Sequence, residues 1–259
     1  MSPRSQHSSL IAISKASLFK PVLVSKAAWF KLQNRKLPNR FIHEQVPYFA
    51  QWKSRRLVAH ILDGSVQAED DPKWKASGAT SKAEYASWSW SACGMACLKM
   101  ILAHRNNSVI PLVTLGKKSL VYGCYDKPLE TSVGLKYTPF VDFLAQEFNI
   151  AAKAAPVLPC DQIVNELAHG NYVMASVNSL IRNPSSKPVG KGGHLVLVLG
   201  YNLDRREFYL HNPSGGIAAS ESYAAVSFQD FTKFFSNKGI VVSGKETNLT
   251  STQASRSSP

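Results

Sequence analysis

Three polar residues have the types and the chain order that thiol catalysis requires: Cys93, His194 and Asn212. Such catalysis needs a sulfur that ionises easily, an imidazole that takes and returns a proton, and a third group that fixes the imidazole tautomer. The cysteine lies in the run Trp88-Ser-Trp-Ser-Ala-Cys-Gly, the histidine follows two glycines, and the asparagine precedes a proline. These residues predict a nucleophile, a general base and an orienting amide.

The segment around the cysteine predicts a buried helix. Residues 92–103 are apolar on nearly every face, with Lys99 the main exception. A helix that begins near Cys93 would place the thiol beside unpaired backbone N–H groups and the positive end of the helix dipole. Both favour a thiolate, so we expect the thiol to be activated by its position. Gly94 would let the backbone approach a bound substrate closely.

Two short strands are expected to bring the base and the amide together. The run Leu195-Val-Leu-Val-Leu, preceded by glycines, predicts a central strand that holds His194 rigidly. Phe208-Tyr-Leu predicts a paired strand that ends close to Asn212, after a turn at residues 202–206. In such an antiparallel pair, positions 194 and 212 lie at the same end. Their side chains can therefore meet.

These motifs resemble the stand-alone, bacteriocin-leader-peptidase-like (double-glycine peptidase-like) members of the papain-like cysteine peptidase superfamily. The resemblance extends over roughly residues 46–242. Ala92-Cys-Gly matches the family's nucleophile motif, Gly192-Gly-His its base motif, and Asn212-Pro its third position. The resemblance implies a papain-like fold in which a helical half carries the nucleophile and a sheet half carries the base.

The resemblance also assigns a fourth residue and shows two departures. Val46-Pro-Tyr-Phe-Ala-Gln resembles the strand that leads into the family's domain, whose glutamine is an oxyanion-hole donor, so the resemblance gives that role to Gln51. The residue after the Cys-Gly pair is commonly proline in the family and here is Met95. The third position is commonly aspartate and here is Asn212, as in papain-like enzymes proper.

The order of helix and strand signals predicts an α+β fold. Helices are expected at residues 56–62, 138–148 and 161–169, and a capping pattern at Ser227-Phe-Gln-Asp precedes a further helix. Strands are expected at residues 172–177, 195–201, 207–211 and 239–242. Helices first and an antiparallel sheet later agree with the papain-like arrangement that the resemblance implies.

Length and composition favour one domain with two tails. A chain of 259 residues with 44% hydrophobic content can bury one substantial core. We expect a basic, partly flexible N-terminal arm at residues 1–43, a papain-like cysteine peptidase-like domain at residues 44–244, and a disordered Ser/Thr-rich tail at residues 245–259. No internal repeat is visible.

The distribution of charge argues against nucleic acid as a partner. The formal net charge is +13, yet residues 1–43 hold eight Lys or Arg and no Asp or Glu. Residues 44–244 are nearly balanced, with 20 basic and 16 acidic residues. A nucleic-acid-binding domain carries its basic patch on the domain itself. The sequence shows neither a secretory signal peptide nor an apolar run of membrane-spanning length, so we expect a soluble, cytoplasmic protein.

We expect no cofactor and no metal. Zinc is the metal to weigh, because Cys93 and Cys97 are four residues apart and His104 lies further along the same predicted helix. Structural zinc sites usually take paired ligands from two short loops, which Cys124 and Cys160 do not supply. Four cysteines in a chain of this kind are expected to be reduced thiols.

Two long connections flank the predicted site. Residues 63–90 carry Trp88 and Trp90, which we expect to be packing anchors for the following helix, and residues 178–191 are rich in Pro, Ser and Gly. Long loops beside a catalytic centre are often lids or specificity walls. A plain surface cover is the alternative for both.

The expected reaction is acyl transfer through a thioester on Cys93. His194 would act as general base and then general acid, Asn212 would orient it, and Gln51 with the backbone N–H of Cys93 would bind the oxyanion. A cysteine peptidase or amidase acting on a peptide or amide is the leading interpretation. An acyltransferase using the same residues and a non-catalytic peptide-binding module stay open. The sequence is silent on substrate identity and oligomeric state.

Overall fold

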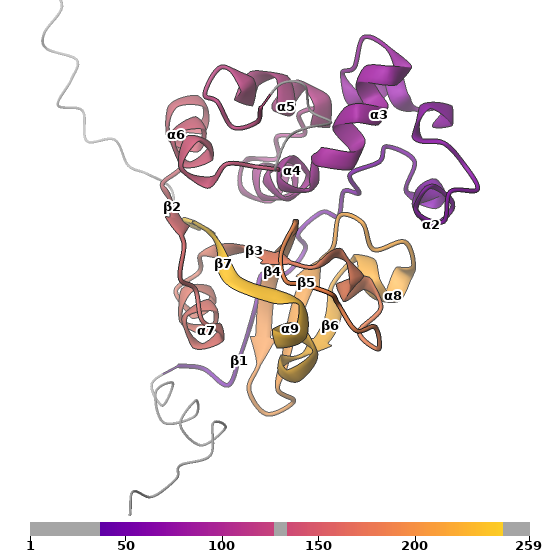
Figure 1. The fold of residues 1–259 in the computed structure, drawn as a ribbon. Coiled ribbons are helices and arrows are strands. Elements are labelled where there is room, and N and C mark those ends of the chain that lie inside the picture. Colours follow the sequence, from indigo (N-terminus) through magenta and orange to yellow (C-terminus); the bar gives the residue numbers. More distant parts are fainter. Residues whose placement is uncertain (1–36, 127–133, 246–259) are drawn as a thin grey trace, which may run out of the picture.

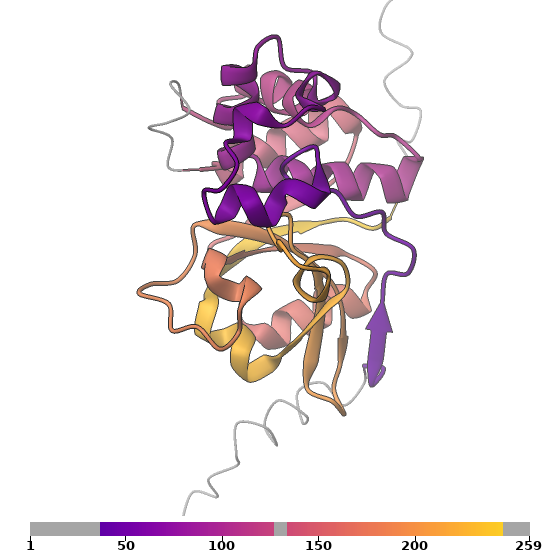
Figure 2. The ribbon, with the colours of Figure 1, turned by 90° about the vertical axis from the view of Figure 1, so that its right-hand side faces the viewer.

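The chain folds into a helical half and a sheet half that lie one above the other (Figures 1 and 2). A computed structural model describes residues 37–126 and 134–245. In Figure 1, helices α3 to α6 gather in the upper half, and the strands with α7 and α9 form the lower half. The α+β architecture expected from the sequence is confirmed.

The helices follow the chain in an order that places the longer ones before the main strands. They are α2 (Val58–Leu62), α3 (Lys82–Ser91), α4 (Cys93–Asn106), α5 (Leu112–Leu120), α6 (Tyr137–Phe148), α7 (Cys160–Ala168), α8 (Ala218–Glu221) and α9 (Phe228–Phe234). A short 3-10 helix at Ser179–Arg182 follows the first central strand. None of the described helices is long and apolar enough to cross a membrane.

The strands form a single sheet. They are β1 (Arg40–Ile42), β2 (Ala152–Ala155), β3 (Tyr172–Val177), β4 (His194–Asn202), β5 (Glu207–His211), β6 (Ala224–Ser227) and β7 (Phe235–Val242). Within the described residues the seven-stranded sheet runs in the order β2-β7-β3-β4-β5-β6, with β1 paired to β4. Every strand pairing among these residues is antiparallel.

The two central strands are buried on both faces. On β4, Leu195, Leu197 and Leu199 face the core of the helical half, whereas Val196 and Val198 face a second core. This alternation is the period of two that a strand imposes on its side chains. Helices α7 and α9 contribute to the second core, so neither face of β4 meets water. The burial explains why the run reads as continuously apolar.

Helix α4 is the centre of the helical half. Residues 94–103 are all buried, and the helix packs directly on β4. Its Cys97 thiol donates a hydrogen bond to the Leu195 carbonyl oxygen at 3.7 Å. A helix that is apolar all round is buried all round, as the sequence predicts for residues 92–103.

The capping pattern at Ser227 predicted the start of α9 correctly. Ser227 is the N-cap, and its Oγ accepts a hydrogen bond from the Asp230 backbone N–H at 3.0 Å. The Ser227 hydroxyl in turn donates to the Asp230 carboxylate at 2.7 Å. The pair satisfies an otherwise unpaired N–H of the first helical turn.

Two expectations about the chain before α4 are wrong. Residues 63–90 are not one long loop, because helix α3 (Lys82–Ser91) occupies their end. Val46–Gln51 is not a strand but an irregular segment, and the first strand among the described residues is β1, which lies within the predicted N-terminal arm. The division of the chain into arm, domain and tail stays a prediction, and residues 1–36 and 246–259 lie outside the described residues.

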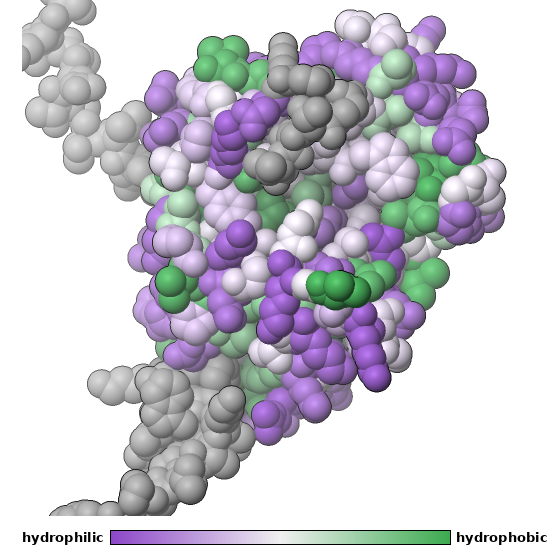
Figure 3. Space-filling model, in the orientation of Figure 1, coloured by the Kyte–Doolittle hydropathy of each residue, from purple (hydrophilic) through white to green (hydrophobic). Residues whose placement is uncertain are grey.

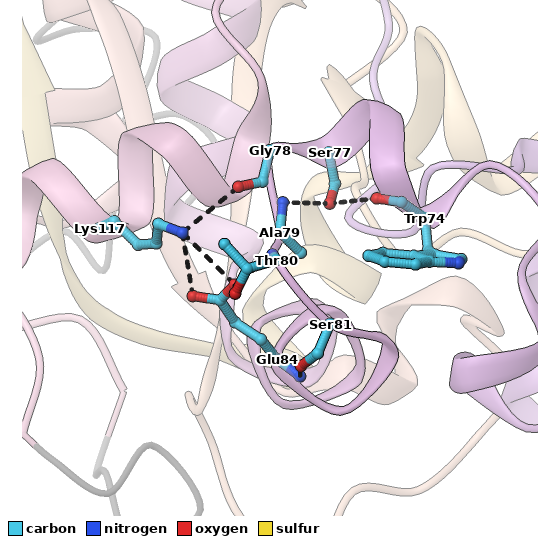
Figure 4. A network of polar contacts seen from close by, with 8 residues as sticks. All are labelled: Trp74, Ser77, Gly78, Ala79, Thr80, Ser81, Glu84 and Lys117. Atoms are coloured by element: carbon cyan, nitrogen blue, oxygen red, sulfur yellow. Dashed lines mark hydrogen bonds and ion pairs between the residues drawn. The ribbon is translucent and has the colours of Figure 1, made fainter.

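A local signal marks the start of α3 and was missed. Ser81 is its N-cap and accepts a hydrogen bond from the Glu84 N–H at 3.0 Å, while the Glu84 carboxylate accepts from Thr80 N–H at 2.6 Å. The spacing Ser-x-x-Glu is that of a capping box. Figure 4 shows this network and the Lys117 ammonium, which lies 3.1 Å from the Glu84 carboxylate and joins α5 to α3.

A buried carboxylate fixes the segment between α2 and α3. Asp71 accepts hydrogen bonds from the Ser54 N–H and hydroxyl, the Lys73 N–H and the Tyr85 hydroxyl. Burial alone would raise the pKa of Asp71, but the hydrogen bonds from Ser54, Tyr85 and Lys73 outweigh it and lower that pKa. Asp71 therefore stabilises the fold as a carboxylate.

We expect Asp71→Asn to destabilise the protein at pH 7 by about 1–3 kcal/mol, because an amide nitrogen would face donors that now bond to oxygen. A lowered folded pKa means that the contribution of Asp71 is present above its unfolded pKa of about 3.9 and is lost as the pH falls through the folded pKa. Urea unfolding at pH 7 and pH 3 should show a smaller penalty in acid. Asp204→Asn, in an exposed turn, is the control. An equal penalty at both pH values would contradict the assignment.

Candidate active site

A cavity of about 690 Å³ lies where the two halves meet, and it contains the predicted nucleophile and base. Its lining residues come from both halves: Trp90, Ser91, Cys93, Gly134, Leu135, Lys136, Tyr137, Thr138, Ala154, Pro156, Ser176, Gly193, His194, Leu195 and Lys238. Apolar surface shows between hydrophilic residues along this boundary in the space-filling view (Figure 3). The helical half supplies the thiol and the sheet half supplies the imidazole.

Cys93 is the first residue of α4, as its predicted role requires. The residue is partly exposed, but its thiol is enclosed by protein. Burial raises the pKa of the thiol, and the backbone N–H groups of Leu195, Gly94 and Cys93 itself oppose that rise. The helix start therefore acts as expected, yet desolvation outweighs it, which corrects the expectation of a thiolate formed by position alone.

His194 is held by Asn212. The Nε2 atom of His194 lies 2.8 Å from Oδ1 of Asn212, and the two residues are 6% and 1% exposed. The amide orientation is well determined, because the same Oδ1 also accepts the Ser214 backbone N–H at 3.1 Å. Since an amide oxygen only accepts, Nε2 must carry the proton. The neutral imidazole then has its lone pair on Nδ1.

The pairing of β4 with β5 explains this contact. The register joins Leu197 to His211, so that its continuation places Ser214 opposite His194. A register shift between Val198 and Gly200 offsets the rest of the pair by one residue. The Oγ atom of Ser214 lies 3.2 Å from His194 Nε2, which agrees with the continued register of Leu197 and His211. The expectation that positions 194 and 212 share one end of the strand pair is met.

The surroundings keep His194 neutral. Burial lowers its pKa to about 4; the hydrogen bond to Asn212 opposes this, and the positive charge of Arg182 adds to it. Arg182 acts from the 3-10 helix after β3, and its Nη2 donates a hydrogen bond to Ser214 Oγ at 3.3 Å. Above about pH 4 the imidazole is therefore in the form that can accept a proton.

Gln51 is not among the residues that line the cavity of Cys93 and His194. Its side chain is buried, and its Nε2 donates to the Ser89 carbonyl oxygen of α3 at 2.8 Å. Its backbone N–H donates to the Pro213 carbonyl oxygen at 2.9 Å, so it adjoins the loop that carries Asn212. Its oxyanion-hole role stays a prediction.

Several residues at the site were missed or misjudged from the sequence. Ser214 contacts the base, Arg182 donates to Ser214, and Tyr48 donates its hydroxyl to the Asn212 carbonyl oxygen at 2.9 Å. Trp88 is buried as the expected anchor, but Trp90 is 55% exposed and lines the cavity. The helical period of α3 could have predicted that Trp88 and Trp90 differ in burial, because residues two apart on a helix point in different directions.

The described residues contain no group of three or more His, Cys, Asp or Glu side chains placed to hold a metal ion. Two of the residues weighed for zinc have other partners: His104 Nδ1 lies 2.7 Å from the Tyr172 hydroxyl, and the Cys97 thiol bonds to a backbone carbonyl. All four cysteines carry free thiols.

Two of three comparisons with known proteins gave a match for this chain. No curated protein matches the chain. Among solved structures, the peptidase domain of Streptococcus ComA, a bi-functional ABC transporter involved in a quorum-sensing pathway, is similar with a TM-score of 0.40 and 12% identity, over 60% of this chain and 93% of that one. The model of the Peptidase_C39 like family matches residues 44–240, which is more than half of the chain. The chain therefore belongs to the Peptidase_C39 like family.

Proposed function

We propose that this protein is a cysteine peptidase or amidase that cleaves a peptide or amide bond by acyl transfer. The observation that carries the proposal is the buried Asn212–His194 hydrogen bond at the edge of the cavity that Cys93 lines. The bond leaves the imidazole lone pair on Nδ1, and a general base needs a free lone pair to accept a proton. Family membership supports the peptide as the class of substrate.

The first half of the reaction forms a thioester. His194 Nδ1 takes the proton of the Cys93 thiol, and the sulfur attacks the carbonyl carbon of the substrate. The carbonyl electron pair moves to oxygen, where the backbone N–H of Cys93 at the start of α4 stabilises the charge. When the tetrahedral intermediate collapses, the C–N bond breaks and the imidazolium gives its proton to the leaving amine.

The second half regenerates the thiol. The neutral imidazole takes a proton from water, the hydroxide attacks the thioester carbonyl, and the C–S bond breaks. The proton then returns to the Cys93 sulfur, so the enzyme ends as it began. An amine or thiol in place of water would make the same residues an acyltransferase. The identity of the released product separates the two reactions.

Both partners are neutral in the free protein. Burial raises the pKa of Cys93 and lowers that of His194, so the ion pair is the less stable state before substrate binds. The oxyanion supplies new negative charge that favours the imidazolium, and proton transfer then accompanies attack. Gln51 keeps the oxyanion-hole role only as what the family resemblance implies: its amide has a second N–H besides the one that bonds to Ser89, but its side chain does not line the cavity.

We expect iodoacetamide to modify Cys93 faster than the buried Cys97 and Cys124 at pH 7, because only Cys93 combines access from the cavity with an adjacent base. His194→Ala should slow that reaction by about 10²-fold, within the range for general-base catalysis. Peptide mass spectrometry over time measures each cysteine separately. Cys160, which is partly exposed on α7, is the internal control. Equal Cys93 rates in the wild type and His194→Ala would rule out an activated pair.

We expect Arg182→Gln to raise the pKa of His194, because the variant removes a positive charge that disfavours the imidazolium. In the wild type, the lowered pKa of His194 keeps its imidazole neutral down to about pH 4. In the variant the imidazole should become protonated at a higher pH, so the Cys93 alkylation rate should begin to fall at a higher pH. The measurement is the alkylation rate from pH 3.5 to 7. Arg205→Gln, in the exposed turn after β4, should leave the limb in place. A shift toward lower pH would contradict the assignment.

A further inference from the structure

A second cavity lies next to the pair of residues that forms the base. Its volume is about 780 Å³, and Asn212 lines it, whereas His194 lines the cavity of Cys93. The two cavities share no lining residue, and the hydrogen bond between His194 and Asn212 joins them. Residues of α2 and α8, at the right of Figure 1, line the second cavity from the two halves of the fold. A ligand there lies beside the residue that holds the base.

Apolar side chains form much of the wall of this cavity. Six of them carry the argument: Leu62, Ile181, Leu210, Ile217, Ala224 and Val226. Most are buried, but Ile217 is 61% exposed and leaves a large apolar surface open to solvent. Sites for small ligands span about 300–1,000 Å³ and are lined mainly by apolar groups. The cavity therefore favours an occupant with apolar surface of its own.

One cation of the lining has no partner of opposite charge. Arg182 Nε donates to the Ser179 carbonyl oxygen at 2.9 Å, and Nη2 donates to Ser214 Oγ at 3.3 Å. Its Nη1 forms no hydrogen bond with the described residues and is not among their enclosed polar atoms that lack a partner, so it is accessible. No carboxylate of the described residues forms an ion pair with Arg182. Burial lowers the pKa of the guanidinium, a cost that a bound carboxylate would offset.

The carboxylate that the described residues contribute to the lining is engaged elsewhere. Asp63 is exposed and accepts hydrogen bonds from the Ser65 N–H at 2.9 Å and the Ser65 hydroxyl at 2.6 Å. These bonds lower the pKa of Asp63, and Arg182 is not among the causes of that shift. Apolar walls and an uncompensated guanidinium together favour a ligand that combines an apolar group with a carboxylate.

We propose that this cavity binds the C-terminal end of the peptide substrate, with the terminal carboxylate on Arg182 and an apolar C-terminal side chain between α2 and α8. A free C-terminus with an apolar last residue offers both features that the cavity favours. The inference rests on the proposed function and names its substrate class, which is peptides that are cut close to an apolar C-terminus.

The distance between Arg182 and the base sets where the cut falls. Ser214 Oγ lies 3.2 Å from His194 Nε2 and also accepts from Arg182, whose charge acts on the pKa of His194. An extended peptide advances about 3.4 Å per residue, so a carboxylate on Arg182 lies roughly two or three residues beyond a peptide bond at Cys93. Hydrolysis of that bond consumes one water. It releases a dipeptide or tripeptide with a free amine and leaves a new carboxylate on the remaining chain.

Binding is tested on the full chain carrying Cys93→Ala, which forms no thioester. The probes are acetyl-alanyl-leucine, its C-terminal amide and acetyl-alanyl-glycine, each titrated at pH 7 by calorimetry. We expect acetyl-alanyl-leucine to bind at least about tenfold more tightly than its amide, because the amide has no charge to offer Arg182. Ile217→Ser should reduce the preference for leucine over glycine and keep the preference for acid over amide.

Variants at the cation test the assignment in the same Cys93→Ala protein. Arg182→Gln should remove the difference between acid and amide, and Arg182→Lys should keep part of it, because the charge stays. Lys187→Gln, on the same connection but outside the lining, should leave both affinities unchanged. At pH 7 the imidazole of His194, with its pKa of about 4, is neutral, so its titration does not enter the comparison.

Cleavage is tested on the protein with Cys93 intact. The substrates are random-sequence decapeptides that end in leucine, made as free acids and as C-terminal amides, and mass spectrometry locates each cut. We expect the cut two or three residues from the C-terminus, with the free acids cleaved at least about tenfold faster. Arg182→Gln should bring the two rates together.

The two measurements separate this inference from the reaction itself. Equal binding of acid and amide, an unchanged preference in Arg182→Gln, or cuts at internal positions at equal rates would each overturn the inference, even where cleavage depends on Cys93. Binding of the acid through Arg182 without cleavage of any peptide would support the site and contradict the proposed peptidase activity.

Discussion

The contact between α4 and β4 is the constraint on which the site depends. Both elements are apolar over most of their length, and their apolar residues can be buried fully only against the other element and the layers beyond it. Cys93 is the first residue of the helix and His194 is the first residue of the strand. Packing that is driven by apolar surface therefore sets the positions of two polar residues, and the site inherits the rigidity of the core.

That burial has an electrostatic consequence. The same packing that holds the thiol and the imidazole removes them from water, and both then favour their neutral forms. Asn212 offsets part of the desolvation cost of the imidazolium through its hydrogen bond, while the positive charge of Arg182 adds to that cost. In the reaction that we propose, the thiol and the imidazole start as neutral groups, and the oxyanion that forms during attack stabilises their charge separation.

Much of the fold could be predicted from local patterns. The elements α4, α7, β3 and β5 follow from runs of apolar residues with a clear period, because burial selects side chains along one face or on every face. Helix α3 was missed, since its Trp and Ser residues alternate and its capping signal at Ser81 lies in a segment rich in turn residues. The short strands β1, β2 and β6 carry too few residues for a period to show.

Residue types and chain order were enough to predict that Cys93 and His194 lie at one cavity and that His194 meets Asn212, because the predicted strand pair brings the last two together. Their catalytic roles stay a prediction. Three features could be found only in the folded chain: the placement of Gln51, the contact of Ser214 with the base and of Arg182 with Ser214, and the enclosed thiol. These features depend on how segments pack together in the fold. One cause is the one-residue shift in the register of β4 and β5, and the other is the desolvation of His194 between the two halves. Register and burial are properties of packed surfaces, and no local pattern specifies them.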